Sequence, residues 1–249
     1  MTGPRTGDAF GEMVRAALSR EVAQREAAVT EIIERDDGFV WANAASKYLA
    51  APPAWAPFER RALGLARGRV LDVGCGAGRF SLPLQARGLP VTALDVSPGA
   101  AAVTTARGVR RVVTGTVADH AASGARYDTF LLMGENLGLL ESATRAPAFL
   151  AELAAIAAPG AQIIGHGVDP LRAGHPAHAR YFARNSEIGK LPGQMTLRIR
   201  HGDIATPWFD YLLAAPPLLR ELTAGTPWTV TAVDIADAVN YLAVLAGQP

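Results

Sequence analysis

The chain contains 249 residues, of which 49% are hydrophobic, 19% charged and 7% aromatic. This length suits one large domain or two small ones and is ample for a buried core. Lys and Arg number 24 against 23 Asp and Glu, so the formal net charge is +1, which argues against a dedicated nucleic-acid-binding protein. The single cysteine, Cys75, excludes an internal disulfide and with it the secreted, disulfide-stapled class.

Targeting and membrane segments are not visible in the sequence. The first residues have no apolar run of the kind found in signal peptides. The longest apolar stretches, 150–158 and 241–246, are far shorter than the roughly 20 residues that span a bilayer. We therefore expect a soluble, cytoplasmic protein without a membrane partner.

The first 68 residues are predicted to be helical. Apolar residues recur at three-and-four spacing over 8–35, with Asp8 as a plausible N-cap and Gly38 as a C-terminal stop. Two further helices are predicted over 41–49 and 58–65, and no strand signal precedes Arg69. We therefore expect residues 1–68 to form a helical cap over an active site, ahead of a catalytic domain over 69–249.

From Arg69 onward short strands alternate with helices. The expected strands are 70–73, 90–95, 109–114, 129–133 and 161–165, and the expected helices are 80–87, 97–107 and 147–157. This alternation predicts an α/β fold with a doubly wound, mostly parallel sheet of seven strands covered on both faces.

The C-terminal third departs from this alternation. A polar insertion is expected over about 166–214, with an antiparallel pair of strands at 195–200 and 208–213. The run Trp208-Phe209-Asp210-Tyr211 is expected to be strand core. A helix over 217–224 and closing strands over 229–234 and 241–245 complete the prediction.

A glycine-rich turn follows the first of these strands. Gly74, Gly76 and Gly78 would let the backbone approach a ligand closely and present N–H groups at a helix N-terminus, which suits a carboxylate or a phosphate. The dinucleotide fingerprint requires a third glycine at the position of Arg79, so the spacing here is different.

Two acids accompany this turn. Asp72 precedes it, which suits a cationic ligand and would repel a pyrophosphate. Asp95 ends the next strand, 21 residues after Gly74 (95 − 74), where a carboxylate can accept both hydroxyls of a ribose. A ligand with an amine, a carboxylate, a ribose and an adenine but no phosphate fits this pattern, and S-adenosylmethionine (SAM) is such a ligand.

The segment 69–164 resembles the class I SAM-dependent methyltransferases. The resemblance is carried by the stretches 70–78, 94–97 and 127–133. It implies SAM as cofactor and S-adenosylhomocysteine (SAH) as product, with Asp95 on the ribose, Val96 on the adenine and Asn136 near the sulfonium. Many members of this class carry an acid after the third strand, where this chain has backbone at Thr116 and Val117 and a weaker candidate in Asp119. The full set of expected cofactor-binding residues is Asp72, Gly74, Cys75, Gly76, Gly78, Asp95, Val96, Thr116, Val117, Met133 and Gly134.

Further side chains are candidates for catalysis or substrate binding. His166 directly follows the fifth strand and could act as general base, and Asn136 could hold the acceptor or the SAM amine. Expected substrate-pocket residues are Trp41, Tyr48, Glu135, Tyr181 and Asn185.

Other reactive residue types have simpler interpretations. Cys75 is expected to be a small filler rather than a nucleophile, and His120 a solvated surface residue. His175 and His178 lack a completing ligand, so no metal is expected.

The sequence thus predicts methyl transfer from SAM to an O, N or C nucleophile of a small molecule, without a nucleic-acid partner. Two alternatives stay open: a protein of this fold that binds SAM or SAH without transferring methyl, and, less favoured, an NAD(P)-dependent oxidoreductase.

Overall fold

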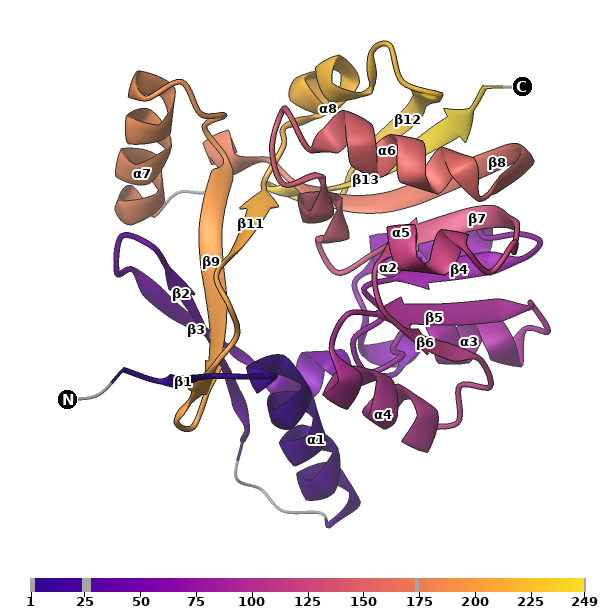
Figure 1. Cartoon of the computed structure of the whole chain (residues 1–249), viewed down its shortest axis with the longest axis horizontal. Helices are drawn as coiled ribbons and strands as arrows, with labels where there is room; N and C mark the ends of the chain where they lie inside the picture. The colour runs from indigo at the N-terminus through magenta and orange to yellow at the C-terminus, as the bar shows by residue number, and fades with distance from the viewer. Residues whose placement is uncertain (1–2, 24–27, 173–174, 249) are drawn as a thin grey trace.

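Two β-sheets lie beside each other in the computed structural model, which describes residues 3–23, 28–172 and 175–248 (Figure 1). The larger sheet has seven strands in the order β12-β13-β8-β7-β4-β5-β6. The strands β4 to β8 run parallel, and only β13 runs against the others. This confirms the predicted fold class. The strand bounds are β4 Val70–Val73, β5 Val91–Asp95, β6 Val112–Thr114, β7 Tyr127–Leu132, β8 Ala157–Val168, β12 Trp228–Ile235 and β13 Asn240–Gly247.

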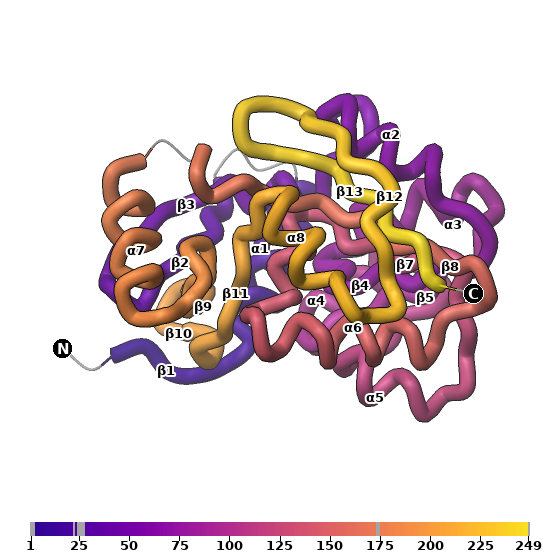
Figure 2. The backbone as a smooth tube through the Cα atoms, turned by 90° about the horizontal axis from the view of Figure 1, so that it is seen from above, coloured from indigo at the N-terminus to yellow at the C-terminus, as the bar shows by residue number. Residues whose placement is uncertain are grey.

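Helices cover both faces of this sheet, as Figure 2 shows from above. On one face Phe130 of β7 packs with Leu150 of α6 and Leu219 of α8 in the largest apolar cluster. On the other face Val70 of β4 packs with Phe58 of α2. Because both faces are covered, every residue of β4 is buried, including Asp72. The helices that cover the two faces are α2 Pro57–Leu65, α3 Ser81–Ala86, α4 Pro98–Ala106, α5 Val117–Ala121, α6 Ala146–Ala155 and α8 Pro216–Thr223.

The smaller sheet combines the N-terminal segment with the insertion. Its central strand β9 pairs with β2 on one side and with β10 and β11 on the other, while β3 pairs with β2 and β1 with β10. The bounds are β1 Arg5–Thr6, β2 Thr30–Arg35, β3 Val40–Ala44, β9 Gln194–His201, β10 Ile204–Ala205 and β11 Phe209–Leu212.

The prediction that the N-terminal segment is entirely helical is therefore wrong in part. Helix α1 covers Ala9–Val22 and α2 forms as expected, but residues 30–44 form a β-hairpin. Gly38, with φ of +85°, serves its turn and is not a helix stop. The hairpin is stabilised by pairing with β9, about 160 residues further along the chain, and this long-range partner is invisible to local periodicity. Part of the predicted helix, residues 24–27, lies outside the described residues.

The insertion contains a helix that the sequence did not predict. Helix α7, Pro176–Glu187, packs Tyr181 and Phe182 against Met195 of β9. The prediction that 208–211 is strand core is wrong for most of the run, because Trp208 is 42% and Phe209 36% exposed and Asp210 faces solvent. Short 3₁₀ helices complete the chain: η1 Ala45–Tyr48, η2 Pro52–Ala54, η3 Asn136–Leu140 and η4 Pro170–Arg172.

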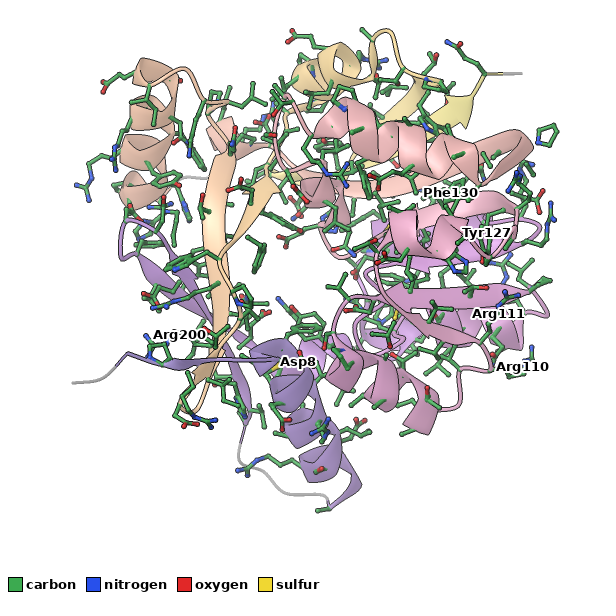
Figure 3. The ribbon with its side chains drawn as sticks, viewed as in Figure 1. Asp8, Arg110, Arg111, Tyr127, Phe130 and Arg200 are labelled. Carbon is green, nitrogen blue, oxygen red and sulfur yellow. The ribbon has the colours of Figure 1, made fainter. Side chains whose placement is uncertain are left out.

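One carboxylate joins the N-terminal segment to the larger sheet. Asp8 caps α1, as predicted, by accepting from Gly11 N at 2.9 Å. It also accepts from Ser97 Oγ at 2.7 Å and from Gly99 N at 2.8 Å, in the first turn of α4. Figure 3 labels Asp8 at the start of α1. A Cβ on Gly11 would lie 2.6 Å from the Gly99 Cα, so the two helices cross where neither has a side chain. Asp8 therefore caps two helices that pack together.

Candidate active site

The glycine loop follows β4 at the carboxyl edge of the larger sheet. Gly74, Gly76 and Gly78 have φ of 69°, 57° and 71°, in the region that favours glycine. Gly78 serves packing, because a Cβ there would lie 2.9 Å from Thr104 Cγ2. Gly76 N donates to Asp95 Oδ2 at 2.8 Å, so the loop is tied to the end of β5.

The two predicted acids are both buried beside this loop. Asp72 is 2% exposed and accepts from Ser81 Oγ at 2.6 Å; burial raises its pKa to about 7, and the charge of Asp95 adds to the effect. Asp95 accepts from Gly76 N and, at 2.9 Å, from Ser97 N, and burial raises its pKa to about 6. A positively charged ligand group near these carboxyls would favour their ionised forms.

The residues that follow β5 and β6 have distinct environments. Val96 is 67% exposed directly after Asp95, so it offers an apolar surface at the loop. Thr116 caps α5 together with Asp119, whose Oδ2 accepts from Thr116 N at 3.0 Å and from Thr116 Oγ1 at 2.7 Å. The carboxylate of Asp119 is thus used by a capping box. Val117 is buried.

The chain turns sharply after β7 through two left-handed residues. Gly134 has φ of 72° and Glu135 φ of 71°, a conformation uncommon for a residue with a side chain. The backbone of Glu135 is held on both sides, because its N–H donates to His166 Nδ1 at 2.9 Å and its C=O accepts from Tyr211 Oη at 2.7 Å. We call residues 133–136 the β7 corner.

Asn136 connects the β7 corner to the glycine loop. Its Nδ2 donates to Val73 O at 2.9 Å and to Gly74 O at 3.0 Å. Both amide hydrogens are used by these carbonyls, so the side chain can offer a ligand only its acceptor, Oδ1. The amide therefore presents an acceptor beside Gly74.

His166 lies at the β7 corner, and both of its ring nitrogens already make hydrogen bonds. Since Nδ1 accepts from Glu135 N, the proton lies on Nε2, which donates to Asn240 Oδ1 at 2.9 Å. Asn240 Nδ2 in turn donates to Asp237 Oδ2 at 2.9 Å. The His166 side chain is also buried against Phe58. This arrangement argues against the expected role of general base, because no ring lone pair is free to take a proton.

Glu31 is a candidate site residue that the sequence pattern does not single out. It is 1% exposed on β2 and accepts from Tyr48 Oη at 2.6 Å, from Asn43 Nδ2 at 3.0 Å and from Lys47 Nζ at 2.9 Å. Tyr48 lies over the glycine loop, with Cδ1 3.7 Å from the position of a Cβ on Gly76. Alternation of Glu31, Ile33 and Arg35 along one face of a strand is the available signal, but the three-and-four spacing of apolar residues over 8–35 predicts a helix there.

The predicted substrate-pocket residues fall into two groups. Tyr48 and Glu135 lie at the glycine loop and the β7 corner, whereas Trp41, Tyr181 and Asn185 lie where α7 meets the smaller sheet. Tyr181 donates to Asp36 at 2.7 Å, and Asn185 Nδ2 donates to Gln194 O at 2.6 Å. Trp41 packs against His178. These three side chains therefore hold α7 to the smaller sheet.

Cys75 and His120 are both buried. Cys75 packs with Ala93 and Val109, and burial raises the pKa of its thiol well above the usual value, so it is a core side chain, as the filler interpretation predicted. The prediction that His120 is solvated is wrong, because it is 6% exposed and its Nε2 lies 2.6 Å from Tyr127 Oη.

The two histidines at the start of α7 have structural contacts. His175 Nδ1 caps α7, and His178 Nδ1 lies 2.9 Å from Arg35 Nη1. Within the described residues, no three His, Cys, Asp or Glu side chains are grouped to hold a metal. The helices of those same residues include none with the length and apolarity to cross a bilayer.

Comparison with known families identifies the central part of the chain. Residues 70–160, which carry the glycine loop, both acids and the β7 corner, match a family model described as "Methyltransferase domain". No curated protein sequence matches the chain. The chain thus contains a methyltransferase domain, which confirms the enzyme class that the sequence predicted.

Solved structures extend this likeness to almost the whole chain. A SAM-dependent methyltransferase from Bacteroides fragilis in complex with SAH is 22% identical, covers 97% of this chain and 95% of its own, and has a TM-score of 0.79. The Burkholderia thailandensis 1,6-didemethyltoxoflavin-N1-methyltransferase with bound substrate and SAH is 17% identical, covers 100% and 94%, and has a TM-score of 0.53. DhpI in complex with SAH is 20% identical, covers 98% and 100%, and has a TM-score of 0.55. The chain has the class I SAM-dependent methyltransferase fold.

Proposed function

We propose that this protein transfers a methyl group from SAM to a nucleophilic O, N or C atom of a small molecule. The observation that carries the proposal is the arrangement at the end of β5, where Asp95 joins the glycine loop to Ser97 and Val96 is exposed beside it. A carboxylate suited to ribose hydroxyls thus lies next to an apolar surface suited to an adenine. When bound, SAM supplies an electrophilic methyl group on a sulfonium.

The remaining groups at the loop suit the amino-acid end of SAM. Asn136 Oδ1 is an acceptor beside Gly74, and the buried Asp72 favours positive charge nearby. Main chain at Gly74 and Gly76, where no Cβ intervenes, would contact this end. Contacts from Cys75 would be through its backbone, because its side chain faces the core. Contacts at Thr116, Val117, Met133 and Gly134 are part of the same proposal.

A small-molecule acceptor is supported by what surrounds the loop. Tyr48 from the N-terminal segment lies on the glycine loop, and Tyr211 from the insertion lies on the β7 corner. The solved neighbour from Burkholderia carries a small-molecule substrate, 1,6-didemethyltoxoflavin. Enclosure of this kind favours desolvation and in-line positioning of the acceptor as the main sources of rate. In this proposal His166 positions Glu135 and does not remove a proton.

Calorimetric titration with SAH, with NAD as control, tests the proposal. We expect micromolar binding of SAH and none of NAD. Asp95→Ala should weaken SAH binding by about 2 kcal/mol, or about 30-fold, because two ribose hydroxyls lose their partner. Asp128→Ala is the matched control. Asp128 lies near the start of β7, at the edge of the sheet opposite to the glycine loop, so this substitution should leave the affinity unchanged.

The outcomes separate the alternatives. Binding of NAD alone would refute the methyltransferase proposal and favour the oxidoreductase. Tight SAH binding with no methylated product across an acceptor screen would favour a protein of this fold that binds SAM without methyl transfer.

A further inference from the structure

Two phenols flank the region where the glycine loop meets the β7 corner. Tyr48 lies on the glycine loop, Tyr211 packs against Gly138 just beyond the corner, and Asn136 ties the two loops together. Both phenols are half-buried. They come from the N-terminal segment and from the insertion, so the two added parts of the chain meet the methyltransferase domain here.

The hydroxyl protons of both phenols are already used. Tyr48 donates to Glu31 Oε1 at 2.6 Å, and Tyr211 donates to the carbonyl of Glu135 at 2.7 Å. A phenol has one proton to donate, so each oxygen can offer a ligand only its lone pairs. The amide of Asn136 is in the same state, because both of its hydrogens are bonded to backbone carbonyls. Toward a ligand these three groups can therefore only accept hydrogen bonds, because their own protons are already donated to the protein.

The charged groups nearby also favour a ligand that donates hydrogen bonds or is positively charged. Burial raises the pKa of both phenols, and the negative charges of Glu31 and Glu135 raise it further, so both carboxylates act on both hydroxyls. Glu135 is exposed at the corner, whereas Glu31 is buried with Lys47, a half-exposed cation, as its counter-charge. After this pairing, the Glu135 carboxylate is the negative charge that acts on both hydroxyls without a counter-ion among the described residues.

We propose that the methyl acceptor of this protein is an amine, whose N–H groups donate to the oxygens of Tyr48 and Tyr211 while Glu135 favours its positive charge. The proposal rests on the proposed function, because it names the substrate class of that same site. Hydrogen-bond acceptors on the protein require donors on the ligand, and a primary amine supplies two when neutral and three when protonated. An anionic oxygen acceptor would meet lone pairs and a carboxylate, both of which repel it.

Methyl transfer from SAM to an amine accounts for every atom, electron pair and charge. An amine bound in its protonated form first releases one proton to water. The nitrogen lone pair then forms the new C–N bond while the C–S bond breaks, and the electrons of that bond stay on sulfur, which yields SAH. The positive charge passes from sulfur to nitrogen, so the product is a methylammonium ion. The carboxylate of Glu135 favours positive charge throughout, and no co-reactant is required.

The test compares matched acceptors on the whole chain. Benzylamine, phenethylamine and cyclohexylmethylamine are each paired with the alcohol and the carboxylic acid of the same skeleton. Binding to the SAH-loaded protein is measured by calorimetry, and methylation with SAM by product mass. We expect each amine to bind at least tenfold more tightly than its partners, and methylated products from amines only. An alcohol or acid that binds as tightly as its amine, or the absence of any amine preference, overturns the inference.

Substitutions test whether Glu135 in the β7 corner causes the preference for amines. Glu135→Gln should reduce the preference for amines about tenfold, because it removes the charge and leaves a polar side chain of the same size. Glu34→Gln is the matched control and should keep the preference, because Glu34 lies on the face of β2 opposite to Glu31 and is paired with Arg198 and Arg200. An unchanged preference in Glu135→Gln would overturn the role of this residue. SAH titration is performed first: failure of SAH to bind refutes the proposed function, whereas SAH binding without amine preference refutes only this inference.

Discussion

Asp72 should destabilise the folded chain at neutral pH, and Asp72→Asn should remove that effect. The carboxyl is 2% exposed, and burial raises its pKa from 3.8 to about 7. Between pH 4 and 7 the folded state therefore binds more protons at this site than the unfolded state. The free energy of unfolding must then fall as pH rises through this window and stay level above it.

The magnitude follows from the size of the pKa change. Each tenfold change in an acid dissociation constant is worth about 1.4 kcal/mol. From pH 5 to pH 8, Asp72 should lower the free energy of unfolding by about 3 kcal/mol, nearly all of it below pH 7. The asparagine variant cannot ionise, so its free energy of unfolding should fall by about 3 kcal/mol less over the same interval. It retains an oxygen that can accept from Ser81.

Guanidinium unfolding of both proteins at pH 5 and pH 8 measures this difference. Asp128→Asn is the control, because the hydrogen bond from Arg69 lowers the pKa of Asp128 and its contribution has the opposite sign. Its stabilising effect is present above the unfolded pKa and is lost as pH falls through the lower folded pKa. Equal pH dependence of the wild type and Asp72→Asn would refute the assignment of a buried, protonatable carboxyl at the glycine loop.

Two further substitutions test groups that join separate elements. His166→Ala should lower both turnover and the free energy of unfolding, the latter by about 1–3 kcal/mol, because Glu135 N and Asn240 Oδ1 lose their partner. The shape of the kcat/KM profile against pH should not change, and loss of one limb of that profile would restore the general-base role. Asp8→Ala should cost about 1–3 kcal/mol in denaturant unfolding, because it uncaps both α1 and α4. A loss no larger than that of the exposed Glu12→Ala in α1 would show that the shared cap contributes nothing.

Some of this site could be predicted from the chain because its signals are local. Gly74, Gly76 and Gly78 have positive φ, a requirement that follows from the turn itself. Asp72 and Asp95 lie on short strands flanked by helices, and parallel strands bring their carboxyl ends to one edge. The likeness to the methyltransferases follows from these same residues.

The role of His166 could not be predicted in this way. Its expected place after the fifth strand suggests a base, but the structure puts it inside β8, with Glu135 N and Asn240 Oδ1 on its two nitrogens. One partner is 31 residues away in the chain and the other 74. The protonation state of an imidazole is set by such partners, so its sequence position does not determine its chemistry.

By itself the sequence determined the larger sheet, the glycine loop and the two acids, because each depends on the spacing of residues within a few turns of chain. Tertiary structure decided the smaller sheet, in which the hairpin over 30–44 exists because β9 pairs with it. It also decided the surroundings of the loop, where Tyr48 bonds Glu31 and Tyr211 bonds the backbone of Glu135. Hydrogen bonds between such segments fix where each proton lies, and local periodicity carries no information about them.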